Sequence, residues 1–225
     1  MAARVGICAH ASLIAAQLLR VREAWPDIWQ RTGRVQMASA FLASLVIGGW
    51  AVTGESEACA TGLWTHGGGS SGATVSGIQS RWDEGVLEIV GGNREEAMRM
   101  WNWLGEVDMS GGRKKIGNVS RYLVDRYGFD PGMKIYPTVF SLLTSAVETI
   151  VTPFTSDFLS SYLSLCPAPS DAVLSFGPMD MLMTPAPHYL PTRLYHIYPH
   201  PAQDPSEKRR YVAILSSRCV FAYLT

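Results

Sequence analysis

A short apolar segment that ends in a glycine lies in the C-terminal half of the chain. It reads Ala172-Val173-Leu174-Ser175-Phe176-Gly177 and predicts a buried strand followed by a tight turn. The backbone N–H groups of such a turn can bind phosphate oxygens. Ser175, Phe176 and Gly177 are therefore candidates for a phosphate site, although the same layout is common in turns that bind nothing.

A second polar group precedes a short apolar run. Thr155, Ser156 and Asp157 stand before Phe158 and the residues that follow it at helical spacing, and Pro167 closes the run. All three side chains suit the N-cap of a helix, and an aspartate in this position is most often a cap. The pattern alone therefore favours a structural role for Asp157, while leaving its carboxylate available for a second one.

Other candidate sites lack the spacing that their chemistry needs. The glycine-rich run 67–72 is not followed by the GK[ST] ending of a nucleotide-binding loop, so we expect a flexible loop there. His196 and His200 cannot share one face of a helix because Pro199 lies between them. The four cysteines form no CxxC pair. The sequence therefore predicts no metal site and no redox dithiol.

The elements that position these residues follow from hydrophobic periodicity and from glycine and proline. We expect helices over residues 13–25, 34–47 and 117–127, two short helices between 82 and 104 that are separated by Gly91-Gly92, and strands within 50–64 and over 211–216. The stretch 185–205 is rich in proline and contains His188, His196 and His200. This mixture indicates an α/β protein in which the aromatic residues between 82 and 104 belong to the core. The helix over 34–47 is expected to pack Val35, Ala38, Phe41, Leu42 and Leu45 on one side.

Composition excludes several classes of partner. A hydrophobic content of 47% excludes intrinsic disorder, and equal numbers of basic and acidic residues, 19 each, leave no net field for nucleic acid or an anionic membrane. The longest apolar stretch, 35–49, is shorter than the roughly 20 residues of a membrane span. We expect a cytoplasmic protein without nucleic-acid or membrane partners. An imported or secreted protein is the alternative, because residues 4–19 have the charged start of a presequence.

Several runs, in order along the chain, resemble the FGGY carbohydrate kinases and, within that family, the xylulose kinases. They are similar to the family's RISLVSSFLASL helix, DACGMNLW strand, YFVxRYGF helix, PFTGD segment and DxxVSLGT strand, and they occupy residues 34–45, 57–64, 117–129, 153–157 and 171–177. The resemblance implies part of a ribonuclease H-like, actin-like ATPase fold. Two such domains would close around a cleft that binds ATP and a sugar, here D-xylulose.

The resemblance also implies roles for the candidate residues. Asp157 would be the general base that takes the proton of the sugar hydroxyl as it attacks the γ-phosphate of ATP, with Mg²⁺ neutralising charge. Ser156 and Phe158 would lie in the sugar site, and Ser175, Phe176 and Gly177 would form a phosphate-binding turn. The product would be xylulose 5-phosphate.

The chain departs from the family at positions where members of the family contact their substrates. Phe158 replaces the family's asparagine, Cys8 stands where relatives carry an arginine, and Pro178 removes a backbone N–H from the phosphate turn. A ribulose or glycerol kinase therefore remains an alternative. A non-catalytic remnant or interaction protein is another.

The same alignment predicts the domain organisation. Residues 1–133 correspond to the later part of the first kinase domain, 134–149 to an insertion or non-native segment, 150–170 to the catalytic-aspartate segment and connection, and 171–225 to the start of the second domain. About half of a full kinase would be absent, so we expect this chain to be inactive by itself.

Overall fold

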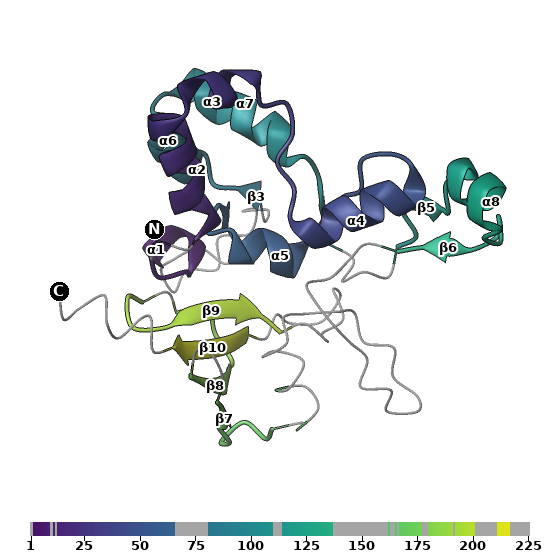
Figure 1. The fold of residues 1–225 in the computed structure, drawn as a ribbon. Helices are drawn as coiled ribbons and strands as arrows, with labels where there is room; N and C mark the ends of the chain where they lie inside the picture. Colours follow the sequence, from purple (N-terminus) through teal and green to yellow (C-terminus); the bar gives the residue numbers. More distant parts are fainter. Residues whose placement is uncertain are drawn as a thin grey trace.

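The computed structural model describes residues 2–9, 11, 13–65, 81–109, 114–136, 162, 165, 167–176, 180–190, 192–200 and 211–216. The N-terminal elements are mainly helical, with α1 (Ala2–Val5), α2 (Ile14–Ala24), α3 (Pro26–Arg31), α4 (Ala38–Ile47), β1 (Thr53–Gly54), α5 (Glu55–Ala60), β2 (Trp64–Thr65), β3 (Arg81–Trp82), α6 (Glu84–Gly91), α7 (Arg94–Leu104) and β4 (Val107–Asp108). After them come β5 (Gly117–Asn118), α8 (Arg121–Tyr127), β6 (Lys134–Ile135), β7 (Val173–Ser175), β8 (Met181–Ala186), β9 (His196–Pro199) and β10 (Tyr211–Ser216). In Figure 1 the helices lie above a sheet made of the last four strands.

Helices α6 and α7 form a hairpin that local sequence signals specify. The carboxylate of Asp83 accepts a hydrogen bond from the Val86 N–H at 2.8 Å, and the Asn93 side chain accepts one from the Glu96 N–H at 2.8 Å. Between the helices Gly92 has φ +86°, which a residue with a side chain seldom adopts. The predicted pair of helices around Gly91-Gly92 is confirmed.

Buried tryptophans hold the helical part together. Trp29 and Trp103 pack edge to face with ring centroids 4.8 Å apart, and Trp64 and Trp82 do so at 5.0 Å. All four side chains are at most 5% exposed. Such pairs stabilise a core by about 1 kcal/mol beyond their buried area. The prediction that the aromatic residues between 82 and 104 are core is confirmed for Trp82 and Trp103.

The last four strands form one antiparallel sheet in the order β7-β8-β10-β9. Its buried face includes Val173, Met183 and Ile214, which lie side by side in the register of the three adjacent strands. The strand predicted at 211–216 is confirmed. The strand predicted at 172–177 is present as β7, but Leu174 is 54% exposed, so it is not buried along its length as expected. Within the proline-rich stretch 185–205, for which no strand was predicted, β8 extends to Ala186 and β9 occupies 196–199.

Two elements differ from their predictions because of contacts that the local sequence pattern does not show. The helix expected from residue 34 begins at Ala38, because the Val35 N–H is donated to the Trp103 carbonyl at 3.0 Å. Part of the strand expected at 57–64 is instead helix α5. There the Glu57 side chain accepts from the Gly54 N–H and closes the helix N-terminus.

Helix α4 leads into an arm that contains β5, α8 and β6 and extends away from the other helices (Figure 1). Strand β5 pairs with β6, and the Ser120 N–H donates to the Val46 carbonyl at 2.7 Å. Helix α8 ends at Gly128, as predicted, but begins only at Arg121. The segment expected to be an insertion, 134–149, thus starts with residues of β6.

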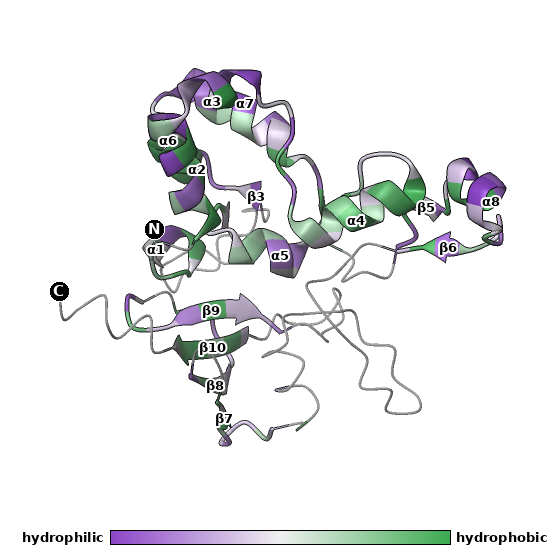
Figure 2. Ribbon diagram, in the orientation of Figure 1, coloured by the Kyte–Doolittle hydropathy of each residue, from purple (hydrophilic) through white to green (hydrophobic). Residues whose placement is uncertain are grey.

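The apolar face predicted for α4 is not buried. Phe41, Leu42 and Leu45 are 49%, 59% and 57% exposed, whereas Ala40 and Ala43 face the interior. Figure 2 shows α4 as a predominantly hydrophobic helix within this arm. The predicted direction of the apolar face is therefore wrong, and a large apolar surface lies open to solvent.

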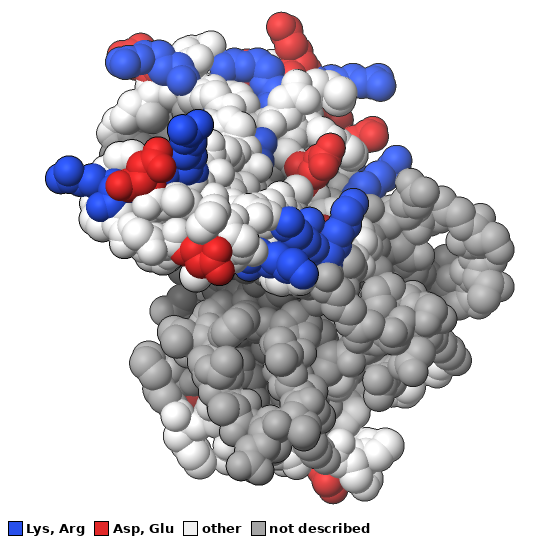
Figure 3. All heavy atoms as spheres, turned by 90° about the vertical axis from the view of Figure 1, so that its right-hand side faces the viewer, with Lys and Arg blue, Asp and Glu red and all other residues white. Residues whose placement is uncertain are grey.

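Charge is mixed on one face of the molecule. On the face shown in Figure 3, basic and acidic side chains lie next to one another over the described part. Within the described residues, no helix combines the length and hydrophobicity that crossing a bilayer requires.

Candidate functional site

The candidate phosphate turn is described only in its first half. Ser175 is the last residue of β7, is half-buried and pairs with Met181 of β8. Phe176 follows it and is 77% exposed. Gly177, Ser156, Asp157 and Phe158 lie outside the described residues. The structure therefore places the strand that leads into the turn, and the relation of Asp157 to that turn remains a prediction.

The N-terminal segment around Cys8 is joined to the last sheet. The Ile197 N–H donates to the Gly6 carbonyl at 2.8 Å, and the Cys8 N–H donates to Nδ1 of His196 at 3.0 Å. Gly6 has φ +68°, and a Cβ there would lie 2.6 Å from Cγ2 of Ile197. This close approach of the backbone requires glycine.

The Cys8 thiol is directed inward. Its Sγ lies 3.3 Å from the carbonyl oxygen of Arg193, and the residue is 6% exposed. A thiol in this position donates to the protein backbone, so it does not reproduce the forked donor of an arginine.

No cluster of metal ligands forms in the part of the chain that can be described. Nδ1 of His196 is occupied by the Cys8 N–H, while the His200 ring lies 6.1 Å from that of Tyr162. Across the described residues, no three His, Cys, Asp or Glu side chains gather as metal ligands.

A buried carboxylate was missed in the sequence. Glu57 is fully buried, accepts a hydrogen bond from the Ser39 hydroxyl of α4 and accepts another from the Gly54 N–H at 3.4 Å. Burial raises the pKa of Glu57 from 4.5 to about 7, and the Gly54 N–H opposes this rise. The glutamate three residues after Gly54, among small apolar residues, was the signal that could have revealed it.

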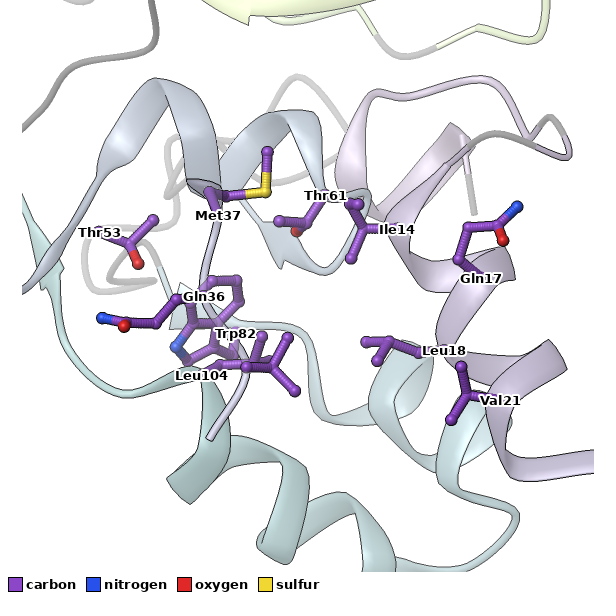
Figure 4. Close-up of a pocket in the computed structure, with 11 residues that line it drawn as sticks. Ile14, Gln17, Leu18, Val21, Gln36, Met37, Thr53, Thr61, Trp82 and Leu104 are labelled. Carbon is purple, nitrogen blue, oxygen red and sulfur yellow. The ribbon is translucent and has the colours of Figure 1, made fainter. Parts of the chain in front are cut away.

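A cavity of about 190 Å³ lies between α2 and the chain that precedes α4 (Figure 4). Its walls come from α2, from the extended residues before α4, from β1 and β3 and from the ends of α5 and α7. The lining residues are Ile14, Gln17, Leu18, Val21, Val35, Gln36, Met37, Thr53, Thr61, Trp82 and Leu104. Apolar side chains dominate this set, so the cavity is suited to an apolar occupant.

Comparison of the sequence with known proteins finds sugar kinases. No family model matches the chain. Proteins named probable D-xylulose kinase A from Aspergillus terreus and Aspergillus flavus are each 30% identical to it over 203 residues. The match covers 89% of this chain and 30% of each relative, so the chain spans about 30% of the length of these curated proteins.

Comparison of the fold gives the same class of protein. The xylulose kinase of Rhodospirillum rubrum superposes with a TM-score of 0.65 at 13% identity, covering 95% of this chain and 36% of that structure. The glycerol kinase of Plasmodium falciparum, solved with ADP, gives 0.65 at 14% identity, with 99% and 38% covered. The gluconate kinase of Lactobacillus acidophilus gives 0.63 at 16% identity, with 94% and 35% covered. The expected partial actin-like fold is confirmed.

Proposed function

The chain is similar to sugar kinases of the FGGY family over most of its length, and from this premise we propose that its chemistry is the phosphorylation of a sugar by ATP. The observation that carries the proposal is the 30% identity to proteins named D-xylulose kinase over 89% of the chain. D-Xylulose is accordingly the proposed acceptor and xylulose 5-phosphate the product. We place the reaction in the cytoplasm.

Asp157 is the proposed general base. Its carboxylate would take the proton of the attacking sugar hydroxyl while the new O–P bond forms and the bond to the leaving ADP breaks. Ser156 and Phe158 would flank the sugar, and backbone donors of Ser175, Phe176 and Gly177 would hold the transferred phosphate. The half-buried end of β7 at Ser175 is compatible with such a turn.

Mg²⁺ would enter with the nucleotide. The described residues offer no three-ligand cluster, and Mg²⁺ in such reactions is bound largely through phosphate oxygens. It neutralises charge on the β- and γ-phosphates when bound. The residues that this chain contributes to the proposal are therefore those that position the sugar and the phosphates.

The identity of the sugar is the least constrained part of the proposal. The inward-facing Cys8 thiol and Phe158 replace two polar groups of the family's sugar site. Fewer directional hydrogen bonds to the sugar should weaken its binding and reduce turnover. D-Ribulose and glycerol are the competing acceptors.

The second candidate function is that of a non-catalytic protein that binds through its surface. The exposed apolar face of α4, formed by Phe41, Leu42 and Leu45, favours it. Such a protein would bind neither nucleotide nor sugar and would associate through that face.

The test measures ADP release and binding in parallel. Purified full chain is incubated with Mg-ATP and D-xylulose, D-ribulose or glycerol, and Mg-ATP binding is followed by calorimetry. Because this chain is expected to be inactive or nearly so by itself, we expect binding of Mg-ATP and at most a slow ADP release with D-xylulose. Asp157→Asn should reduce that release at least about hundredfold, since a general base contributes roughly 10²–10⁴-fold. Asp180→Asn, an exposed aspartate near β8, is the matched control.

Three results would contradict parts of the proposal. Binding of neither Mg-ATP nor sugar supports the non-catalytic alternative. Faster ADP release with D-ribulose or glycerol than with D-xylulose would show that D-xylulose is not the preferred acceptor. Equal release by Asp157→Asn and the wild type removes Asp157 as the base.

A further inference from the structure

The cavity beside α2 is distinct in its lining from the residues proposed for phosphoryl transfer. Neither Ser175 nor Phe176 contributes to its wall. Ile14, Leu18 and Val21 lie one turn apart along α2 and line one side, and Trp82 and Leu104 line the side opposite in Figure 4. The space between these two walls is thus bounded by apolar groups from distant parts of the chain, and it opens to solvent on the side of the exposed Gln17.

Its size suits a small organic molecule. An apolar protein cavity of about 150 Å³ stays dry and binds benzene. The volume beside α2, about 190 Å³, leaves room for a benzene ring with one small substituent. Wall atoms that face empty space lack dispersion partners, so an apolar occupant of this size would gain them.

Most polar groups around the cavity are already engaged. Nε2 of Gln36 donates to the Ser44 hydroxyl and the Ala51 carbonyl, each at 3.1 Å. The Thr61 hydroxyl donates to the Ala58 carbonyl and accepts from the Leu63 N–H. A water molecule needs two to four polar partners to be held, and these groups offer few.

Thr53 is the exception. It is 3% exposed, lines the cavity, and its hydroxyl makes no hydrogen bond with any of the described residues, although its backbone N–H donates to the Glu106 carbonyl at 3.1 Å. It therefore marks one place in the wall where a ligand would gain from carrying a polar atom.

We propose that this cavity is a binding site for a small, neutral, mainly apolar molecule, of the size of a substituted benzene, whose single hydroxyl or carbonyl group pairs with Thr53. The aromatic or aliphatic body of the ligand packs against the side chains of α2 and Trp82. This site goes beyond the proposed kinase chemistry and does not depend on it.

The experiment uses phenol and toluene as probes of nearly equal size. Binding of each to the full chain is measured by calorimetry and by chemical-shift changes in isotope-labelled protein. Both probes should bind saturably and compete with each other. Thr53→Val removes the hydroxyl at nearly constant volume and should weaken phenol about fivefold, the worth of one hydrogen bond, while toluene changes less than about twofold.

Filling the cavity provides the second arm. Val21→Phe places a ring in the space and should weaken both probes at least about tenfold, whereas Ile28→Phe adds a ring on the exposed surface of α3 and should change neither. Circular dichroism verifies that each variant is folded, and Leu18→Phe replaces Val21→Phe if that variant is not.

Failure of either probe to bind saturably would overturn the proposal. So would unchanged binding in the folded cavity-filling variant, or an absence of competition between phenol and toluene on the wild type. Equal weakening of both probes by Thr53→Val would remove Thr53 from the site.

Discussion

The buried Glu57 carboxylate makes the stability of the fold depend on pH, and Glu57→Gln should abolish that dependence. Glutamine keeps the volume of glutamate, its oxygen can accept from the Gly54 N–H, and its amide can donate to the Ser39 hydroxyl. The substitution therefore removes the ionisation and leaves the packing at the N-terminus of α5 intact.

The direction and the size of this pH dependence follow from the pKa of Glu57. Burial raises the pKa of Glu57 from 4.5 to about 7, so the folded protein holds this proton over a pH range in which the unfolded chain has lost it. Stability is fully present below about pH 4.5 and is lost as the pH rises toward 7. At 1.36 kcal/mol per pH unit, the loss amounts to about 3 kcal/mol between pH 4 and pH 8.

The assay is urea unfolding followed by tryptophan fluorescence at several pH values from 4 to 8. The free energy of unfolding of Glu57→Gln minus that of the wild type should increase by about 3 kcal/mol across this range. Glu88→Gln removes one exposed carboxylate on α6 and should leave the corresponding difference nearly constant. A difference that does not vary with pH for Glu57→Gln, or a Glu57 carboxyl signal in NMR that titrates near pH 4.5, would refute the reasoning.

Two further predictions concern a cap and a surface. Asp83→Ala removes both the cap on the Val86 N–H and the ion pair with Arg4 at 2.8 Å, so the free energy of unfolding should fall by about 2 kcal/mol in urea unfolding. Arg4→Gln should cost less than about 1 kcal/mol, because Arg4 is largely exposed, and an equal loss would show that the ion pair dominates. The double variant Leu42→Ser, Leu45→Ser should reduce concentration-dependent association in sedimentation experiments without changing the melting temperature by more than a few degrees. Unchanged association would exclude the α4 face as the contact.

Elements whose signals are local were predictable. Helices α6 and α7 carry their own caps at Asp83 and Asn93, and glycine separates them. Strand β10 is a continuous run of apolar residues. In these places propensity, capping and periodicity agree, and the structure follows them.

Elements that depend on distant partners were not predictable. The chain before α4 is extended because Val35 pairs with Trp103, almost 70 positions later. Helix α5 starts where Glu57 meets Gly54 and also Ser39 of α4. Strands β8 and β9 contain prolines, which lower the local propensity to form a strand. Their hydrogen-bonded pairing with β10 stabilises them as strands. Tertiary contacts decided each of these cases.

The features of the candidate site also differ in whether the sequence could predict them. The strand that leads to Ser175 was predictable from its apolar run and is confirmed. The roles of Asp157 and of the turn at Gly177 came from resemblance to a family, and they stay predictions. Neither Glu57 nor the cavity beside α2 was predicted, because burial and empty volume are properties of packing that one sequence does not display.

The hydrogen bonds that join Gly6 and Cys8 to β9 have a consequence for biosynthesis. Cys8 and His196 are 188 positions apart in the sequence, so the strand that supplies His196 and Ile197 is translated much later than Gly6 and Cys8. At about 5–20 residues per second, roughly ten to forty seconds separate the synthesis of the two sides of this contact. Throughout that interval the backbone groups of Gly6 and Cys8 have no β9 strand to pair with, so this contact can form only after the strand has been synthesised.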